Sequence, residues 1–161
     1  MGRAQESVKI AAVQAAPVAF NLTESLKKVE QFTAQAASQG AELVAFPEAF
    51  LSAYPWRYAF DATVGTREPR GMNDDVSYVA NRNPADFTQG RHWYRKYYES
   101  SVAIPSTEFN TLQNAAKENS INLSIGIIEK DGGTLYCTAV LIGKDGTLLN
   151  RHRKVCDKSH K

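Results

Sequence analysis

Hydrophobic residues in the first part of the chain follow two patterns. Short continuous runs indicate β-strands, and a spacing of three or four indicates a helix. Residues 8–14 and 42–46 form short runs of apolar and β-branched side chains, which predict buried strands. Between them, apolar side chains recur every three or four positions over residues 21–39, as they do on one face of a helix. Asn21 is expected to cap this helix and Gly40 to end it. We therefore predict a strand–helix–strand unit with parallel strands that are covered on both faces.

The pattern changes after the second predicted strand. Residues 61–90 carry charges, Gly, Asn and Pro with little periodicity, and are predicted to form a long loop. Residues 91–101 interleave basic and aromatic side chains, which indicates an amphipathic helix and leaves nucleic-acid stacking as an alternative. Another helix is predicted over residues 108–119, with Thr107 as its N-cap.

The C-terminal part of the chain is typical of antiparallel strands joined by tight turns. Strand-forming residues and Gly-containing turns predict three strands, at residues 121–129, at residues 134–143 and from residue 148 onward. The full order is a β-α-β unit, a long loop, helical segments and a β-meander. This order predicts an α/β fold with a mixed sheet.

Composition narrows the class of protein. The chain has 161 residues, of which 43% are apolar and 22% charged, which suits one globular domain and argues against disorder. A net charge of +2 gives no general case for nucleic-acid binding, and no apolar run is long enough to span a membrane. The two cysteines, Cys137 and Cys156, lack metal-binding spacing, so we expect a reduced, cytoplasmic protein without a metal or cofactor.

One carboxylate stands where α/β folds commonly place their chemistry. Glu48 follows the apolar run 42–46 and a proline, at the end of a predicted strand. By itself, such a residue is more often a solvated loop acid. The next segment, residues 50–60, is aromatic and is expected to pack over the sheet. As an alternative, its side chains Tyr54 and Trp56 line an apolar substrate pocket beside Glu48.

Several groups of residues resemble the nitrilase, or carbon–nitrogen hydrolase, superfamily. They are Val-Gln-Ala-Ala-Pro-Val at 13–18, Phe-Pro-Glu-Ala-Phe-Leu-Ser-Ala-Tyr-Pro at 46–55, Leu-Tyr-Cys-Thr-Ala-Val at 135–140 and His-Arg-Lys-Val at 152–155. The extended glutamate element is similar to the nitrilase branch in particular. Ala53 stands where the family more often has glycine, so the backbone of this loop is expected to differ.

The resemblance implies a fold and a domain layout. It predicts a nitrilase-like domain over residues 8–155, an N-terminal extension over residues 1–7, and a tail over residues 156–161 that does not match the family. Family members fold as an α-β-β-α sandwich of two sheets. This chain is expected to form the N-terminal portion of such a sandwich.

The family uses a Glu-Lys-Cys triad, and two of its members map onto this sequence. The resemblance makes Glu48 the general base, or proton acceptor, and Lys154 the residue that stabilises the transition state. In this chemistry a cysteine thiolate attacks the nitrile carbon and forms a covalent thioimidate. The glutamate takes the thiol proton and later activates water, and the products are a carboxylic acid and ammonia.

The nucleophilic cysteine of that triad is not found among these residues. In the family it follows the lysine after a further loop and strand, in a Cys-Trp-Glu-Asn-like setting, whereas this sequence ends at Lys161. Cys137 is predicted to be a small core residue within a strand. Cys156 lies two residues from Lys154 on the same segment, so it could hardly reach the nucleophile's position. We therefore expect a C-terminally truncated member that is inactive alone, such as the pseudogene product of a stop or frameshift.

Two interpretations of such a chain stay open. In the first it is part of a hydrolase that acts on a small nitrile or amide once completed. In the second it is a non-catalytic interaction module that pairs with a full-length relative or with a separate C-terminal half, since family members assemble into oligomers. The basic residues near the C-terminus give weak support to nucleic-acid contact or a localisation signal. An open sheet edge and an uncovered face would make the chain poorly soluble unless another chain covered them.

Overall fold

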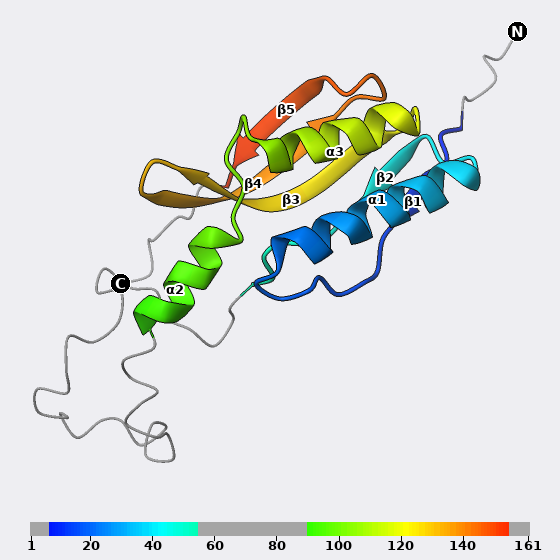
Figure 1. Cartoon of the computed structure of the whole chain (residues 1–161). Coiled ribbons are helices and arrows are strands. Elements are labelled where there is room, and N and C mark those ends of the chain that lie inside the picture. The colour runs from blue at the N-terminus through cyan, green and yellow to red at the C-terminus, as the bar shows by residue number, and fades with distance from the viewer. Residues whose placement is uncertain (1–6, 55–89, 155–161) are drawn as a thin grey trace, which may run out of the picture. The chain divides into compact units, whose positions relative to one another are not determined.

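A computed structural model describes residues 7–54 and 90–154, which fall into two units (Figure 1). The first unit joins the N-terminal part up to Tyr54 with the part from Ser100 onward. It holds a sheet and two of the helices. The described part of the second unit is one helix, α2, Gly90–Glu99. Except for Gly90, which begins α2, the predicted long loop lies outside the described residues.

The first unit is built on a mixed sheet of five strands. The strands are β1 (Ile10–Ala12), β2 (Leu43–Ala45), β3 (Asn122–Asp131), β4 (Thr134–Ile142) and β5 (Leu148–Arg153). They lie side by side in chain order; β1, β2 and β3 are parallel, and β4 and β5 are antiparallel additions. The predicted α/β fold with a mixed sheet is therefore confirmed.

The strand at one edge of the sheet is shorter than predicted, whereas the strand at the other edge begins at the predicted residue. β1 spans only 3 residues because its neighbour β2 also has 3, so the ladder offers it no further partners. Single hydrogen bonds continue beyond it, as when the amide of Val13 donates to the carbonyl of Ala45 over 2.8 Å. β5 runs on to Arg153, and its register with β4 shifts at Leu149, which lies between the partners of Leu141 and Ile142. Its length brings the residue after it, Lys154, to the end of the sheet.

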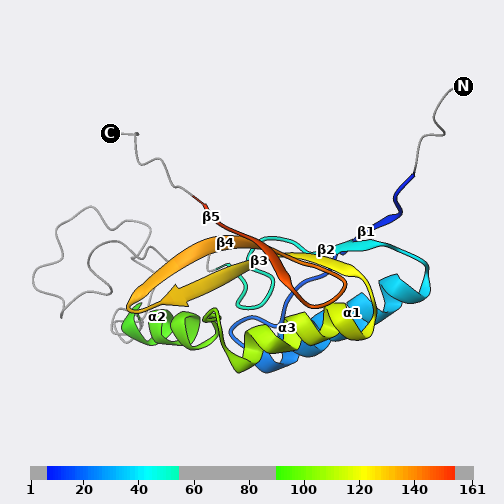
Figure 2. The same cartoon turned by 90° about the horizontal axis from the view of Figure 1, so that it is seen from above.

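Helices α1 (Leu22–Ser38) and α3 (Thr107–Glu118) contact each other and lie on the same face of the sheet, as Figure 2 shows. Asn21 caps α1 as predicted, since its side-chain oxygen accepts the amide of Glu24. The predicted cap of α3 was wrong by one residue. Ser106 has extended backbone and its hydroxyl accepts the amide of Phe109, whereas Thr107 is already helical.

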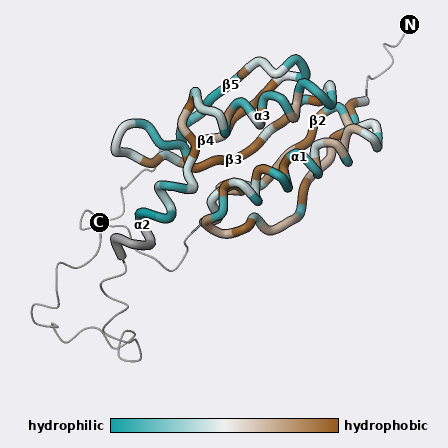
Figure 3. Tube along the Cα trace, viewed as in Figure 1, coloured by the Kyte–Doolittle hydropathy of each residue, from teal (hydrophilic) through white to brown (hydrophobic). Residues whose placement is uncertain are grey.

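The core lies between this helical face and the strands. It contains Val29 and Leu112 from the two helices, together with Val44, Leu123 and Ile125 from the sheet, all fully or almost fully buried. The sheet strands β2 and β3 appear as hydrophobic brown segments in Figure 3.

Within the first unit, neither α1 nor α3 lies over the other face of the sheet (Figure 2). In β2 the central Val44 is completely buried, whereas Leu43 and Ala45 are only half-buried. The prediction that these parallel strands are covered on both faces is thus wrong for the part that the structure describes. Apolar side chains lie open at this face, including Ile10, which is 58% exposed.

The helix α2 ends at Glu99, two residues earlier than predicted. Tyr94 and Tyr98 stack on each other one turn apart, with ring centroids 6.4 Å apart, and Tyr97 is buried. Arg95 pairs with Glu99 across one turn at 2.6 Å. One buried tyrosine and two that stack on each other are typical of an amphipathic helix, which favours that interpretation of residues 91–101 over nucleic-acid stacking.

Candidate active site

Glu48 is placed by its own backbone, which lies against β3. After β2 the amide of Phe46 still donates to the carbonyl of Ser124 over 2.8 Å, and the chain then turns across the sheet. A Cβ added to Gly126 would stand 2.5 Å from the Cα of Glu48, closer than real Cβ atoms approach another atom. Only glycine at this position lets Glu48 come so near the strand.

The loop after Glu48 is fixed rather than extended into solvent. The amide of Phe50 donates to the carbonyl of Gly126 over 3.1 Å, and Phe50 packs against Phe46 with ring centroids 5.1 Å apart. Ala49 has a φ of +54° and Ala53 a φ of +63°, a backbone region that costs alanine energy. At Ala53 the loop therefore keeps a conformation that favours glycine, although the residue is not glycine.

Lys154 reaches the same place from the other edge of the sheet. Its amide donates to the carbonyl of Cys137 over 2.8 Å, so pairing with β4 continues one residue past the end of β5. Its ammonium lies 3.3 and 3.2 Å from the two carboxylate oxygens of Glu48. The structure thus joins two residues that are 106 positions apart in the sequence.

The strand alternation explains why these two groups meet. Ile125 and Ile127 face the helices, so Gly126 between them faces the opposite side, where Glu48 lies against it. Arg153 faces the same side as Ile127, which leaves Lys154 on the side of Glu48. The candidate site therefore lies on the face of the sheet away from α1 and α3.

This ion pair is accessible. The side chains of Lys154 and Glu48 are 58% and 54% exposed. Exposed pairs of this kind contribute about 0–1 kcal/mol to stability, because water competes for both charges. The closeness of the two groups therefore matters for what they could do to a bound molecule more than for the stability of the fold.

Among the remaining predicted site residues, Tyr54 and Cys137 belong to the part of the chain that the structure describes. Tyr54 is described and is 62% exposed. Trp56 and Cys156 lie outside the described residues. Cys137 lies in β4 as predicted, but it is only half-buried and faces away from the helices, so its placement in the core was wrong. Its partner across the ladder, Ile128, has the same orientation.

A second charged cluster was not predicted. Glu129 is completely buried, and its carboxylate accepts hydrogen bonds from the guanidinium groups of Arg151 and Arg153 and from the hydroxyl of Thr138. Burial by itself would raise the pKa of Glu129, but the hydrogen bonds from Arg153, Arg151 and Thr138 outweigh it and lower the pKa to about 2. The sequence signal was a lone acid inside the apolar run of β3.

Arg153 has further partners on the same side of the sheet. It pairs with Asp131 at 2.6 Å and its guanidinium lies over the ring of Tyr136, 3.8 Å from the centroid. Glu129 and Asp131 both raise the pKa of Arg153 through their hydrogen bonds. Together with Arg151 and Glu129 these residues form a cluster of two cations and two anions, which we call the Glu129 cluster. The sheet separates it from Glu48 and Lys154.

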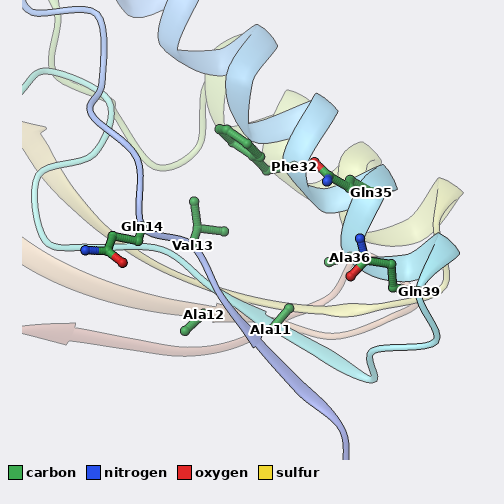
Figure 4. A pocket seen from close by; sticks show the side chains of 8 residues that line it. All are labelled: Ala11, Ala12, Val13, Gln14, Phe32, Gln35, Ala36 and Gln39. Carbon is green, nitrogen blue, oxygen red and sulfur yellow. The ribbon is translucent and has the colours of Figure 1, made fainter.

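A hollow between β1 and α1 lies apart from both charged groups (Figure 4). It is lined by apolar and glutamine side chains: Ala11, Ala12, Val13, Gln14, Phe32, Gln35, Ala36 and Gln39. No ionisable side chain lines it, so it offers neither an acid nor a base. Within residues 7–54 and 90–154, no group of three or more His, Cys, Asp or Glu side chains is placed to hold a metal.

Comparison with known proteins points to one family. The family described as Carbon-nitrogen hydrolase matches residues 9–157. Nitrilase 3 of Arabidopsis thaliana is 36% identical over 153 residues, which are 95% of this chain and 39% of that protein. A bifunctional nitrilase/nitrile hydratase of Lupinus angustifolius is 34% identical over 149 residues, covering 92% and 37%. The chain thus spans about two fifths of the length of these relatives.

Solved structures share the fold. An amidase from Nesterenkonia sp. matches with a TM-score of 0.56 and 19% identity, over 92% of this chain and 43% of that one. A carbon-nitrogen hydrolase from Helicobacter pylori G27 gives 0.55 and 15%, over 94% and 41%. In a mutant of the amidase from Nesterenkonia sp. AN1, acrylamide is joined by Michael addition at the active-site cysteine. Among the described residues of the present chain, no helix has the length and apolar character needed to cross a membrane.

Proposed function

Because the chain belongs to the carbon–nitrogen hydrolase family, we propose that Glu48 and Lys154 are the acid–base half of a nitrile-hydrolysing site. The observation that carries this proposal is the 3.2 Å approach of the Lys154 ammonium to the Glu48 carboxylate across the end of the sheet. Two rigid strands and a buried loop hold the groups, which suits catalysis better than two flexible loops would. The similarity to plant nitrilases favours a nitrile as substrate over an amide.

Each group has a role that follows from its chemistry. Glu48, when ionised, accepts the proton of a thiol that attacks the nitrile carbon, and later takes a proton from the water that attacks the thioimidate or thioester. Lys154 donates hydrogen bonds to the nitrogen or oxygen on which negative charge develops. Over the cycle, one nitrile and two waters give one carboxylic acid and one ammonia. No metal or other cofactor enters this scheme.

The nucleophile is the part of the scheme that the described residues do not supply. Cys137 is the described cysteine, and it is half-buried within β4. A nucleophile needs to approach the substrate carbon over the face of the sheet that carries Glu48 and Lys154, on a segment that lies beside this ion pair. We propose that such a segment completes the site, that this chain is inactive without it, and that the completed protein works in the cytoplasm.

Ammonia release tests the proposal. The chain would be incubated with aromatic and aliphatic nitriles, alone and with the cysteine-bearing C-terminal part of a nitrilase relative. Activity is expected only in the mixture. Glu48→Gln and Lys154→Met should each lower it by about 10²- to 10⁴-fold, because each removes a proton-transfer or charge-stabilising group. Turnover that survives Glu48→Gln would refute the assignment of the base.

A matched control exists in α1. Glu24 and Lys27 form another exposed ion pair, at 2.7 Å, far from the candidate site in sequence. Glu24→Gln and Lys27→Met should leave activity within about twofold, since surface pairs contribute little. Activity of the chain alone that disappears with Cys137→Ala or Cys156→Ala would show that a resident cysteine replaces the expected nucleophile.

The alternative function is that of an interaction module. The face of the sheet away from the helices favours it, because Ile10 and Ala139 are exposed there. Two results together would make the interaction module the better description. The chain would bind a full-length relative, and the chain mixed with the cysteine-bearing C-terminal part would never release ammonia. Light scattering of the chain with and without such a relative measures that binding.

A further inference from the structure

We propose that Glu129 is a positioning residue for Lys154: it anchors Arg151 and Arg153 on the helical side of β5 and so holds Lys154 on the other side, opposite Glu48. The inference rests on the proposed function, because it concerns the geometry of the same ion pair. It assigns a task to a buried carboxylate that touches neither Glu48 nor any group in the reaction scheme.

The burial of Glu129 shows how strongly it is held. Its side chain is 0% exposed, whereas those of Arg151 and Arg153 are 33% and 31% exposed. A carboxylate that loses its water needs charged or hydrogen-bonding partners, and here two guanidinium groups and the Thr138 hydroxyl at 2.9 Å supply them. Removing the carboxylate would leave two arginines without their common anchor.

The geometry links this anchor to Lys154. Arg153 is the residue directly before Lys154, and it stands opposite Thr138 in the register of β4 and β5. The amide of Lys154 pairs with Cys137, the residue next to Thr138. β5 is an edge strand whose end has β4 as its neighbour, and such ends fray most easily. Fixing Arg153 therefore fixes the point from which the side chain of Lys154 departs.

The cluster also prevents a wrong pairing. Arg153 and Lys154 are adjacent cations, and a shift of β5 by one residue would turn Arg153 toward Glu48 in place of Lys154. Arg153 is instead occupied by Glu129, by Asp131 at 2.6 Å and by the ring of Tyr136. Because the Glu129 cluster balances its own charges, Glu48 is left to Lys154. A lysine is the group that the proposed reaction needs there.

Zero-length crosslinking measures the position of Lys154 directly. A water-soluble carbodiimide joins a carboxylate to an amine with loss of one water only when the two are in contact, and mass spectrometry identifies the linked residues. In the full chain we expect a Glu48–Lys154 link. The pair Glu24–Lys27, whose charged atoms lie 2.7 Å apart, gives an internal reference link in the same sample.

The variants isolate the anchor. Glu129→Gln keeps the size of the side chain but removes its charge, and should lower the Glu48–Lys154 link about fivefold or more relative to the reference link. Arg153→Gln should do the same. Glu129→Asp keeps the charge on a shorter side chain and should restore part of the yield. The matched control is Glu99→Gln, whose carboxylate is 57% exposed and pairs with Arg95 within α2, so it should leave the yield within about twofold.

The outcomes separate the inference from the proposed function. Undiminished Glu48–Lys154 linking in a folded Glu129→Gln protein would overturn the positioning role and leave the proposed function intact. Absence of the link in the unmodified chain would overturn both. If Glu129→Gln did not fold, as judged by circular dichroism and loss of the Glu24–Lys27 link, Arg153→Gln would decide, since it leaves Glu129 paired with Arg151.

Discussion

The Cα of Glu48 occupies the space that a side chain on Gly126 would need, with only 2.5 Å left for a Cβ. The candidate base is therefore positioned by contact between two backbones, before any side-chain partner acts on it. β3 serves as the surface against which the loop after β2 is set.

Gly126→Ala should destabilise the protein by about 2–3 kcal/mol, because the methyl group must displace either β3 or the loop at Glu48. Urea unfolding followed by circular dichroism would measure the loss. Gly133→Ala is the matched control, since no atom lies within 4 Å of its added Cβ. A change of similar size at both positions would show that strand flexibility, and not the contact with Glu48, sets the effect.

Ala53→Gly should stabilise the fold by about 0.5–1 kcal/mol. Its φ of +63° strains alanine, and relief of that strain exceeds the entropy that glycine adds to the unfolded chain. The same exchange at Ala34, an exposed position within α1, should destabilise by about 1 kcal/mol. Thermal melts of both variants give the comparison, and equal signs would contradict the argument.

Stability should fall in acid through Glu129. Its pKa is lowered in the folded protein from 4.5 to about 2, so its contribution is complete above 4.5 and is lost as the pH falls toward 2. The contribution corresponds to about 3 kcal/mol at neutral pH. Denaturant titrations between pH 6 and 2.5 should therefore show a steep decline in the wild type that is shallower in Glu129→Gln. Parallel curves for the two proteins would assign the acid sensitivity to other carboxylates.

Ser106→Ala should lower the free energy of unfolding by about 1 kcal/mol, because the amide of Phe109 would lose the hydroxyl that accepts its hydrogen bond. Thr107→Ala, one residue on, should cost clearly less, and Ser106→Asp should be tolerated. The free energies of unfolding of the three variants check the position of the cap. A larger loss of stability in Thr107→Ala than in Ser106→Ala would instead support Thr107 as the N-cap, as the sequence predicted.

The sequence allowed Glu48 and Lys154 to be assigned to one triad because each belongs to a motif that resembles the family. Their roles in catalysis stay a prediction. Glu129 was not predicted as a site residue because the periodicity that identifies strands depends on their apolar residues and says nothing about an acid among them. Its partners stand 22 and 24 positions later, a relation that depends on strand register. Gly126 escaped for a similar reason, since the approach of Glu48 is a tertiary contact.

Smaller errors have local causes. Ser106 and Thr107 can both cap a helix, and only the backbone conformation decides between them. Cys137 was expected in the core because it lies in an apolar strand, yet a shift of one position in a strand moves a side chain to the other face. The fold itself was predictable because its sequence signals are clear. Apolar residues recur every three or four positions in α1 and α3, and strand-forming runs flank a turn in the hairpin of β3 and β4.

The alternation along β5 has a consequence for folding accuracy. Four residues in a row, Arg151 to Lys154, can carry positive charge, so a slip by one residue would still offer a cation to each carboxylate. The slipped ladder would present His152 and Lys154 to Glu129, and neither has the forked guanidinium that binds a carboxylate at two points. The two arginines thus select the strand register. Of two registers with similar electrostatics, they make one far better hydrogen-bonded than the other.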